Sequence, residues 1–420
     1  MHQQQTKRES MNSSKYSEAI KIMNRDKPKI RFKGFEEAWS KKTLGEVCKL
    51  NGRIGFRGYT EEDIITREEG GILTFSPSNI VNNQLKTNGR NTYITKYKFD
   101  ESPEIQVHNG DILFVKTGST LGKSALVNKI YEDATVNPQI VVLKCKNYLQ
   151  SIIASILTTN NILNQVNQAK IGGAIPTLTE TKIKTFHFHI PNSHSESKMI
   201  GLLYSQLDHL LNLQQRKCDK LKDIKKSMLT KMFPKPGKKV PEVRFEGFTD
   251  DWVECFVKDV CNIATGLSNT QDQTENGIYP FFIRSDKPLK SNKYLYDCEA
   301  VITIGDGNIG KVFHYINGKF DLHQRCYKMT DFRYVIGKYF FYYFSTHFYE
   351  RVMKMSAKAT VDSVRLEMIS DMKLLYPVDI KEQKLIAYFF HKLDSLIRLS
   401  ELKLSKLRLL KRSLLEGMFV

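Results

Sequence analysis

The sequence predicts an α+β protein with two globular domains in tandem, each followed by one long helix. Three observations support this fold class: an internal repeat, two long heptad-patterned segments, and short strand-like runs separated by glycine turns. With 420 residues, the chain is longer than one ordinary domain. We expect the two long helices to pair as an antiparallel coiled coil.

The chain contains the same sequence plan twice. Residues 28–52 match residues 241–265 without a gap, at an offset of 213 residues (241 − 28). Trp39 and Trp252, the two tryptophans of the chain, fall in register. A second block starts at Ile190 and recurs at Tyr376, an offset of 186 residues (376 − 190), so the middle of the second copy is 27 residues shorter (213 − 186). A shared frame with divergent middles is typical of one scaffold that carries two binding surfaces.

The repeat divides the chain into six segments. Residues 1–27 are a polar N-terminal extension without the apolar region of a secretory signal. The other segments are expected at 28–192 (first domain), 193–233 (first helix), 234–240 (linker), 241–378 (second domain) and 379–420 (second helix). Strand-like runs at 111–115 and 300–304, followed by glycine turns, predict hairpins inside both domains.

Each long helix is predicted from a start signal and an apolar heptad. Ser193 and Asp379 each precede a glutamate by three residues, which is a capping-box pattern. Apolar residues then recur at alternating spacings of three and four. The expected seam comprises Ile200, Leu203, Leu207, Leu210, Leu221, Ile224 and Met228 in the first helix, and Ile386, Phe389, Leu393, Leu396, Leu407, Leu410 and Leu414 in the second.

Both heptad patterns lose their apolar character at the same two slots, Gln214/Lys217 and Ser400/Lys403. This suits an antiparallel pair whose centres meet, and a polar centre can set the register. A helix of about 35 residues is about 50 Å long, so such a pair would also act as a spacer. The alternative is two unrelated amphipathic helices, each packed on its own domain.

The composition indicates an acidic partner. Lysine and arginine number 64 and aspartate and glutamate 45, a net charge of +19, and a globular chain this basic usually binds a polyanion such as nucleic acid. The seven cysteines form no C-x-x-C pair, which favours a reducing cytoplasm over a disulfide framework or a zinc site. No run of 18 apolar residues occurs, so no membrane span is expected.

The catalytic motifs that we searched for are incomplete. The turn that ends in Gly122-Lys123 has Thr117 where a phosphate loop needs its first glycine, and the second turn has Val312 where Ser or Thr should bind magnesium. Asn137-Pro138 resembles the start of an amino-methyltransferase motif but lacks its second proline and its aromatic residue. We therefore predict a chain that is not an enzyme on its own, with no catalytic residue and no metal ligand.

The repeated plan resembles a known family. A P-x-x-R-F-x-G-F block from Pro28 and a tryptophan open each copy, a divergent globule follows, and a long helix ends in Met-Phe. This plan, over about residues 28–420, resembles the specificity subunit of type I restriction–modification systems. The resemblance implies that each globule is a target recognition domain that reads half of a split, asymmetric site, and that the paired helices hold the two domains apart.

The resemblance also implies the partners. They are double-stranded DNA, two methyltransferase subunits that use S-adenosylmethionine, and restriction/translocation subunits that use ATP and magnesium; the chain itself binds no cofactor. One alternative is a coiled-coil scaffold that joins two modules without DNA affinity, which the charge of +19 disfavours. Another is a self-sufficient methyltransferase-like enzyme, which the missing cofactor loop disfavours.

Glycine-rich and loop-like stretches supply the candidate DNA-binding side chains. They carry donors suited to phosphates or to base edges. The candidates are Arg53, Arg57, Lys116, Ser119, Lys123 and Gln139 in the first copy, and Arg284, Lys287, Asn308, Lys311 and Arg325 in the second. For each of them, a solvated surface position is the alternative interpretation.

Overall fold

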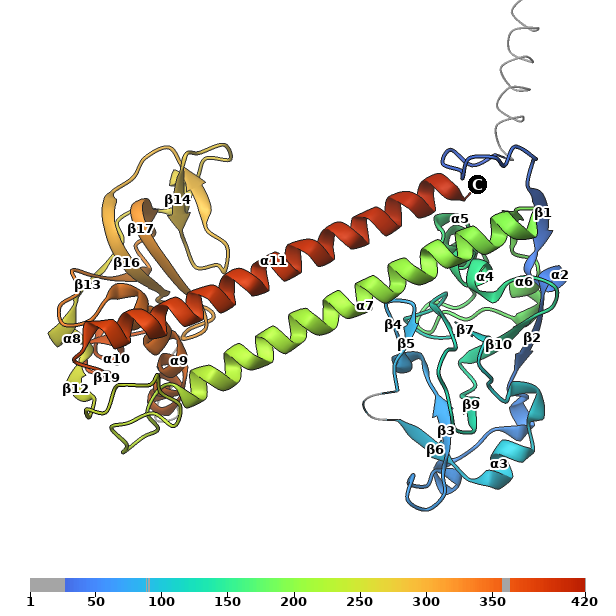
Figure 1. Cartoon of the computed structure of the whole chain (residues 1–420), viewed down its shortest axis with the longest axis horizontal. Helices are drawn as coiled ribbons and strands as arrows, with labels where there is room; N and C mark the ends of the chain where they lie inside the picture. The colour runs from blue at the N-terminus through green and yellow to red at the C-terminus, as the bar shows by residue number, and fades with distance from the viewer. Residues whose placement is uncertain (1–26, 88, 90, 357–362, 420) are drawn as a thin grey trace, which may run out of the picture. The chain divides into compact units, whose positions relative to one another are not determined.

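The computed structural model of the chain describes residues 27–87, 89, 91–356 and 363–419 (Figure 1). Except for Lys27, the N-terminal extension expected at 1–27 lies outside the described residues. The chain divides into two compact units: unit 1 is Met1–Leu213 with Leu404–Val420, and unit 2 is Gln214–Lys403. The units therefore differ from the two sequence copies, because each long helix begins in one unit and ends in the other.

Unit 1 is built on a six-stranded sheet in the order β2-β10-β7-β8-β5-β4, with a three-stranded sheet β6-β3-β9 and a two-stranded ladder β1-β11. The strands are β1 (Ser40–Thr43), β2 (Cys48–Gly52), β3 (Ile72–Phe75), β4 (Ile80–Val81), β5 (Gln84–Leu85), β6 (Thr92–Ile94), β7 (Ile112–Val115), β8 (Ser124–Leu126), β9 (Ala134–Val136), β10 (Ile140–Cys145) and β11 (His187–Ile190). The short helices are α2 (Leu44–Val47), α3 (Lys96–Asp100), α4 (Gln150–Ile156), α5 (Asn160–Ala169) and α6 (Glu180–Lys184).

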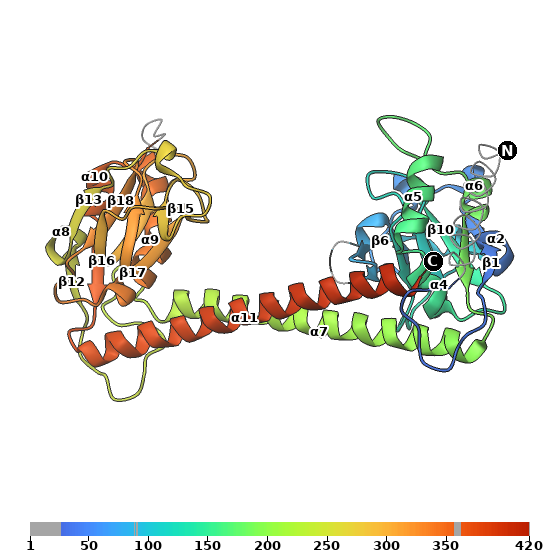
Figure 2. The ribbon, with the colours of Figure 1, turned by 90° about the horizontal axis from the view of Figure 1, so that it is seen from above.

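Unit 2 has a six-stranded sheet in the order β13-β18-β16-β17-β14-β15 and a two-stranded ladder β12-β19. The strands are β12 (Val253–Phe256), β13 (Asn262–Thr265), β14 (Tyr279–Phe282), β15 (Leu289–Ser291), β16 (Tyr296–Ile304), β17 (Phe313–Leu322), β18 (Cys326–Thr330) and β19 (Lys373–Tyr376). The helices are α8 (Val257–Val260), α9 (Gly337–Ser356) and α10 (Leu366–Ser370). Figure 2 shows α9 beside the sheet, where Phe344 packs edge-to-face on Phe313 of β17.

The two sheets share four antiparallel strands and differ at their edges. The shared strands are β2-β10-β7-β8 in unit 1 and β13-β18-β16-β17 in unit 2. The edge hairpin joins parallel to β8 through its second strand, β5, but parallel to β17 through its first strand, β14. The sheet β6-β3-β9 has no counterpart among the described strands of unit 2, which accounts for the longer middle of the first copy.

The long helices are α7 (His194–Lys231) and α11 (Ile380–Met418), each beginning one residue after its predicted start. Ser193 Oγ accepts a hydrogen bond from the backbone N–H of Glu196, at 3.3 Å. Asp379 Oδ1 accepts one from the backbone N–H of Lys381, at 2.7 Å. Both predicted cap residues thus satisfy a free amide of the first turn.

The glutamates of the predicted capping boxes do not cap the helices. Glu196 instead binds Arg31 through two hydrogen bonds of 2.7 and 2.8 Å. At the equivalent place Glu382 binds Arg244 through two bonds of 2.8 Å. A bidentate arginine–carboxylate pair is stronger than one bond to a backbone amide, so the glutamate turns toward the opening block of its copy.

Within each unit, one part of α7 lies beside one part of α11 (Figures 1 and 2). In unit 1 Lys411 binds Asp208, and in unit 2 Lys225 binds Asp394. Both members of these ion pairs are related by the offset of 186 residues (411 − 225 and 394 − 208). Also in unit 2, Gln214 Nε2 donates to Ser400 Oγ at 2.7 Å, which joins two of the four polar seam residues that the sequence singled out.

The predicted seam is wrong at Leu210, Leu396 and Leu410, whereas Leu203, Ile224 and Phe389 are partly buried and pack against the cores. Ile200, Leu207, Ile386 and Leu393 are buried, but Leu210, Leu396 and Leu410 are 49%, 47% and 48% exposed. Further buried residues of the two helices are Tyr204, Cys218, Phe390, Leu404 and Met418. Adjacent residues of a helix are rotated by about 100° around its axis, so a shift of one residue changes the face. The prediction chose leucines because they are more apolar than tyrosine and cysteine.

The Met-Phe end of each helix closes the core of the unit in which it ends. Phe233 of the first copy packs edge-to-face on Trp252, with ring centroids 6.5 Å apart. Phe419 of the second copy packs on Trp39 in the same way, at 6.0 Å. Each unit is therefore completed by the helix end of the other copy. Among the described residues, no helix combines the length and the apolarity that a bilayer crossing requires.

Candidate nucleic-acid interface

Two glycine loops occupy equivalent places in the two units. Residues 116–123 connect β7 to β8, and residues 305–312 connect β16 to β17. In each loop the first residue donates its backbone N–H to the residue that precedes the neighbouring strand: Lys116 to Gln139 and Gly305 to Arg325, both at 2.8 Å. Gln139 and Arg325 therefore hold the same position in the two units.

The second loop residue is also equivalent. Thr117 forms an isolated bridge with Thr177, and Asp306 forms one with Ser363, at the same place in each unit. Thr117 in unit 1 thus corresponds to Asp306 in unit 2. At this shared position, unit 1 therefore has the uncharged Thr117 and unit 2 has the carboxylate of Asp306.

Glycines fix the shape of both loops. Gly118 and Gly122 have φ angles of +105° and +83°, and Gly307 and Gly310 have φ angles of +80° and +69°. These left-handed conformations are strained for residues with a side chain, so the four glycines hold the turn that follows each shared strand.

In unit 1, the loop borders a hollow of about 390 Å³ together with Pro77, Ser78, Ile80, Val81, Asn82 and Gln139. The structure brings together here three residues predicted to bind DNA, namely Ser119, Lys123 and Gln139, all of them exposed. Asn82 and Thr120, which the sequence analysis missed, also line the hollow. The Asn82-Asn83 turn between two short strands was the available signal for Asn82.

Arg53 does not face this hollow as a free cation. Its side chain is only 5% exposed. The guanidinium donates to the carbonyl of Val136 and to Thr135 Oγ1, each at 3.3 Å. Burial lowers the pKa of this arginine. These contacts make Arg53 a structural residue of unit 1, so we leave it out of the DNA surface.

Lys116 and Arg57 also have protein partners. Lys116 Nζ lies 3.1 Å from Glu180 Oε1, and its side chain is 18% exposed. Arg57 donates to the carbonyl of Glu101 at 3.0 Å. Neither residue lines the hollow of unit 1.

In unit 2, the equivalent hollow has a volume of about 320 Å³ and is lined by Thr270, Ile283, Arg284, Asp306 and Gly307. Arg284 Nη1 lies 3.1 Å from Asp306 Oδ2, and Arg325 Nη1 lies 2.8 Å from the same oxygen. The two predicted arginines therefore meet on one carboxylate. The sequence analysis missed Asp306, although it lies in the glycine turn that was singled out.

The electrostatics of this cluster leave a net positive charge. Burial tends to raise the pKa of Asp306, but the hydrogen bond from Arg325 and the charge of Arg284 outweigh it, so the pKa lies below its usual value. One ionised carboxylate thus faces two guanidinium groups. Arg284 and Arg325 remain 46% and 61% exposed, so an anion or a polar acceptor can reach them.

The other three candidates of unit 2 are exposed residues, two in the glycine loop 305–312 and one between β14 and β15. They are Lys287, Asn308 and Lys311. Lys311 Nζ lies 5.2 Å from the ring centroid of Tyr349, which limits the directions that the ammonium group samples. No group of three or more His, Cys, Asp or Glu residues in the described ranges could hold a metal ion.

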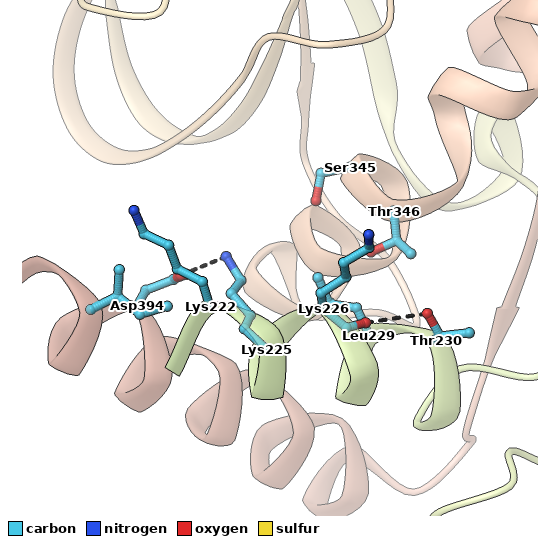
Figure 3. Close-up of a pocket in the computed structure, with 9 residues that line it drawn as sticks. Lys222, Lys225, Lys226, Leu229, Thr230, Ser345, Thr346 and Asp394 are labelled. Carbon is cyan, nitrogen blue, oxygen red and sulfur yellow. Dashed lines mark hydrogen bonds and ion pairs between the residues drawn. The ribbon is translucent and has the colours of Figure 1, made fainter. Parts of the chain in front are cut away.

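A lysine-lined hollow of about 520 Å³ also lies in unit 2 (Figure 3). Lys222, Lys225 and Lys226 of α7 line it. Lys225 is paired with Asp394, and Lys222 lies 2.6 Å from Glu401. With two of its three lysines neutralised, this hollow is a weaker candidate for DNA than the glycine loops.

The chain is similar in sequence and in fold to known proteins. The sequence profile described as "Type I restriction modification DNA specificity domain" matches residues 36–223 and 249–409. The chain is 26% identical over 159 residues to the type I restriction enzyme EcoDI specificity subunit of Escherichia coli, a match that covers 38% of this chain and 34%, about a third, of that relative. It superimposes on the S subunit of a type I restriction–modification system from M. genitalium with a TM-score of 0.70 and 14% identity, over 94% of this chain and 99% of the other.

Proposed function

Because the chain belongs to the type I restriction–modification DNA specificity family, we propose that it selects the DNA sequence on which a larger complex acts. In this proposal, units 1 and 2 each read one half of a split, asymmetric site in double-stranded DNA. The chain catalyses no reaction alone. Methylation with S-adenosylmethionine, and restriction with ATP and magnesium, belong to two methyltransferase subunits and to restriction/translocation subunits.

The pair of equivalent hollows supports this proposal most strongly. A shared four-stranded frame presents a glycine loop at the same place in each unit, but Thr117 and Gln139 stand in one where Asp306 and Arg325 stand in the other. Donors and acceptors at base edges give sequence choice. Two equivalent surfaces with different side chains would read two different half-sites. Exposed lysines beside them, such as Lys123, Lys287 and Lys311, would bind phosphates and supply affinity.

Methylation by the reconstituted complex tests the function. The chain is purified alone and with its methyltransferase partners, and methylated adenines are mapped by sequencing of treated DNA. We expect methylation only in the presence of the partners, at a split motif with different halves. Methylation by the chain alone, or a contiguous motif, would contradict the proposal.

The exchange of one middle segment should change one half of the recognised motif. The opening elements β1, α2 and β2 and the closing elements α6 and β11 have counterparts in the second copy, so residues 53–178 can be replaced by the corresponding segment of a related subunit without altering these elements. Motif mapping should show a new first half and an unchanged second half. A change in both halves would mean that the units do not read independently.

We further propose that α7 and α11 set the distance between the half-sites. The helices have 38 and 39 residues, so each is about 57 Å long at about 1.5 Å per residue. Four residues inserted between Lys217 and Leu221, and four at the equivalent place between Lys403 and Leu407, add about 6 Å and a little over one turn to each helix. The preferred spacer should lengthen by about one or two base pairs, at about 3.4 Å per pair, with both halves unchanged.

A matched insertion controls this experiment. Gly237 lies exposed in the linker between the two copies, outside both helices. Four residues inserted after Gly237 should leave the spacer unchanged. If the helix insertions also leave the spacer unchanged in an active complex, the partner subunits set the distance.

An exposed apolar face on each helix supports the docking of two methyltransferase subunits. Met199, Leu202, Leu210 and Leu213 are 40–51% exposed and share one face of α7. At an offset of 186 residues, α11 carries the equivalent residues Leu385, Tyr388, Leu396 and Leu399, which are 41–58% exposed. Large exposed apolar faces mark protein contacts. Because the face occurs once per copy, we assign it to two copies of the same partner.

A further inference from the structure

The arginine pair on Asp306 of unit 2 carries an inference about the base that it reads, which rests on the proposed function. Arg284 extends from the segment after β14, Arg325 precedes β18, and Asp306 follows β16. Three separate segments therefore converge on one carboxylate, with Nη1 of each arginine within 3.1 Å of Asp306 Oδ2. Asp306 is 18% exposed, much less than either arginine, so it lies behind them.

The shape of this cluster suits base recognition. Each guanidinium uses Nη1 to bind Asp306, and neither makes another hydrogen bond to the residues that the structure describes. Nη2 and Nε of each arginine are therefore available to donate two parallel hydrogen bonds to another group. Such a fork matches the O6 and N7 acceptors of guanine in the major groove.

The carboxylate also disfavours the alternative of a phosphate contact. A phosphate close to these arginines would approach the negative charge of Asp306, whose pKa lies below its usual value, so that it stays ionised at neutral pH. The edge of guanine carries no charge and meets no such repulsion. An arginine held by a partly buried carboxylate also loses less side-chain entropy when it binds.

The equivalent hollow of unit 1 has a different chemistry. There Gln139 replaces Arg325, and Thr117 replaces Asp306. A glutamine side chain pairs with N6 and N7 of adenine rather than with guanine. The two units therefore differ in chemistry at two equivalent positions, and Arg284 adds a third difference from the edge segment of unit 2.

We propose that Arg284 and Arg325 read guanine in the half-site of unit 2, with Asp306 as the residue that positions them. The side chains at the positions of Thr117/Asp306 and Gln139/Arg325 decide which purine each unit prefers. A site in which this guanine is replaced by adenine should bind the wild-type complex about 5- to 150-fold more weakly, the range expected for one bidentate base contact.

The test measures binding of the complex with its methyltransferase partners to a library of duplexes randomised within the motif. Three variants are compared with the wild type: Arg325→Gln, Arg284→Ala and Asp306→Asn, the last of which keeps the size of the side chain but removes its charge. Each should reduce the preference for guanine at one position of the second half-site, and Arg325→Gln should shift it toward adenine. The first half-site should stay the same.

The outcomes separate the inference from the function on which it rests. An unchanged motif in all three variants, or a uniform loss of affinity without a change of motif, would overturn the base assignment and leave the specificity function intact. The absence of any preferred sequence for the wild-type complex would overturn the function itself. As a reciprocal test, the double variant Thr117→Asp with Gln139→Arg in unit 1 should introduce a guanine preference into the first half-site. If it does not, the side chains at these two positions do not decide which purine a unit prefers.

Discussion

Replacement of Glu382 by alanine is expected to destabilise unit 2 by about 3–5 kcal/mol. The carboxylate is 1% exposed and binds Arg244, which is 12% exposed and whose pKa the carboxylate raises. Without Glu382, a charged guanidinium stays largely buried without a partner, which costs far more than the loss of a surface ion pair. The same reasoning applies to Glu196 and Arg31 in unit 1, where the exposed fractions are 1% and 13%.

The measurement is denaturant unfolding followed by tryptophan fluorescence. Each unit contains one buried tryptophan, so a Trp39→Phe background leaves Trp252 as the reporter of unit 2. Glu350→Ala in the same background is the matched control, because Glu350 pairs with Lys354 on the surface, at 63% and 70% exposure, and should contribute about 0–1 kcal/mol. The pair Arg244→Met with Glu382→Leu should recover much of the loss. Equal effects of Glu382→Ala and Glu350→Ala would refute the buried-pair argument.

Leu393→Asp is expected to destabilise the chain by roughly 3–5 kcal/mol, whereas Leu396→Asp is expected to have little effect on its stability. Both leucines belong to the heptad predicted from the sequence, three residues apart on α11. Leu393 is 7% exposed within the core of unit 2, and Leu396 is 47% exposed. A charge at the first position is buried without a partner, and a charge at the second is solvated.

In complex assembly, a specific effect is expected from Leu396→Asp, the variant that leaves stability nearly unchanged. If Leu396 lies in the docking face for the methyltransferase, Leu396→Asp should weaken association with that subunit while the melting temperature of the chain stays near the wild-type value. In unit 1, Leu207 is 6% exposed and Leu210 is 49% exposed. The variants Leu207→Asp and Leu210→Asp therefore repeat the comparison there. Unimpaired assembly of both Leu210→Asp and Leu396→Asp would exclude this face as the docking surface.

The candidate site was only partly predictable, because sequence identifies donors but not their neighbours. Ser119, Lys123 and Gln139 meet at one hollow, whereas Arg284 and Arg325 meet on Asp306, which lines the other. Arg53 has the same chemistry as Arg284, yet it is buried against backbone carbonyls of its own unit. The difference lies in contacts between strands that are distant in the chain, which no local pattern reports.

By itself, the sequence determined the features that depend on local order and on repetition. The framing blocks, the two long helices and their polar centre follow from apolar spacing, cap residues and an ungapped repeat, and the recognised plan pointed to the specificity family. These signals are local, or they compare one segment directly with another.

The tertiary structure alone decided which side chains face one another. It left the predicted seam residues Leu210, Leu396 and Leu410 exposed, since packing selects the buried face of a helix and not the nearest leucine. It showed that Glu196 and Glu382 bind Arg31 and Arg244 instead of capping their own helices. It also closed each unit with the helix end of the other copy and brought Asp306 between two arginines. Each of these outcomes depends on the burial of charge or of apolar surface between segments far apart in the chain, and that free energy exists only once the chain has folded.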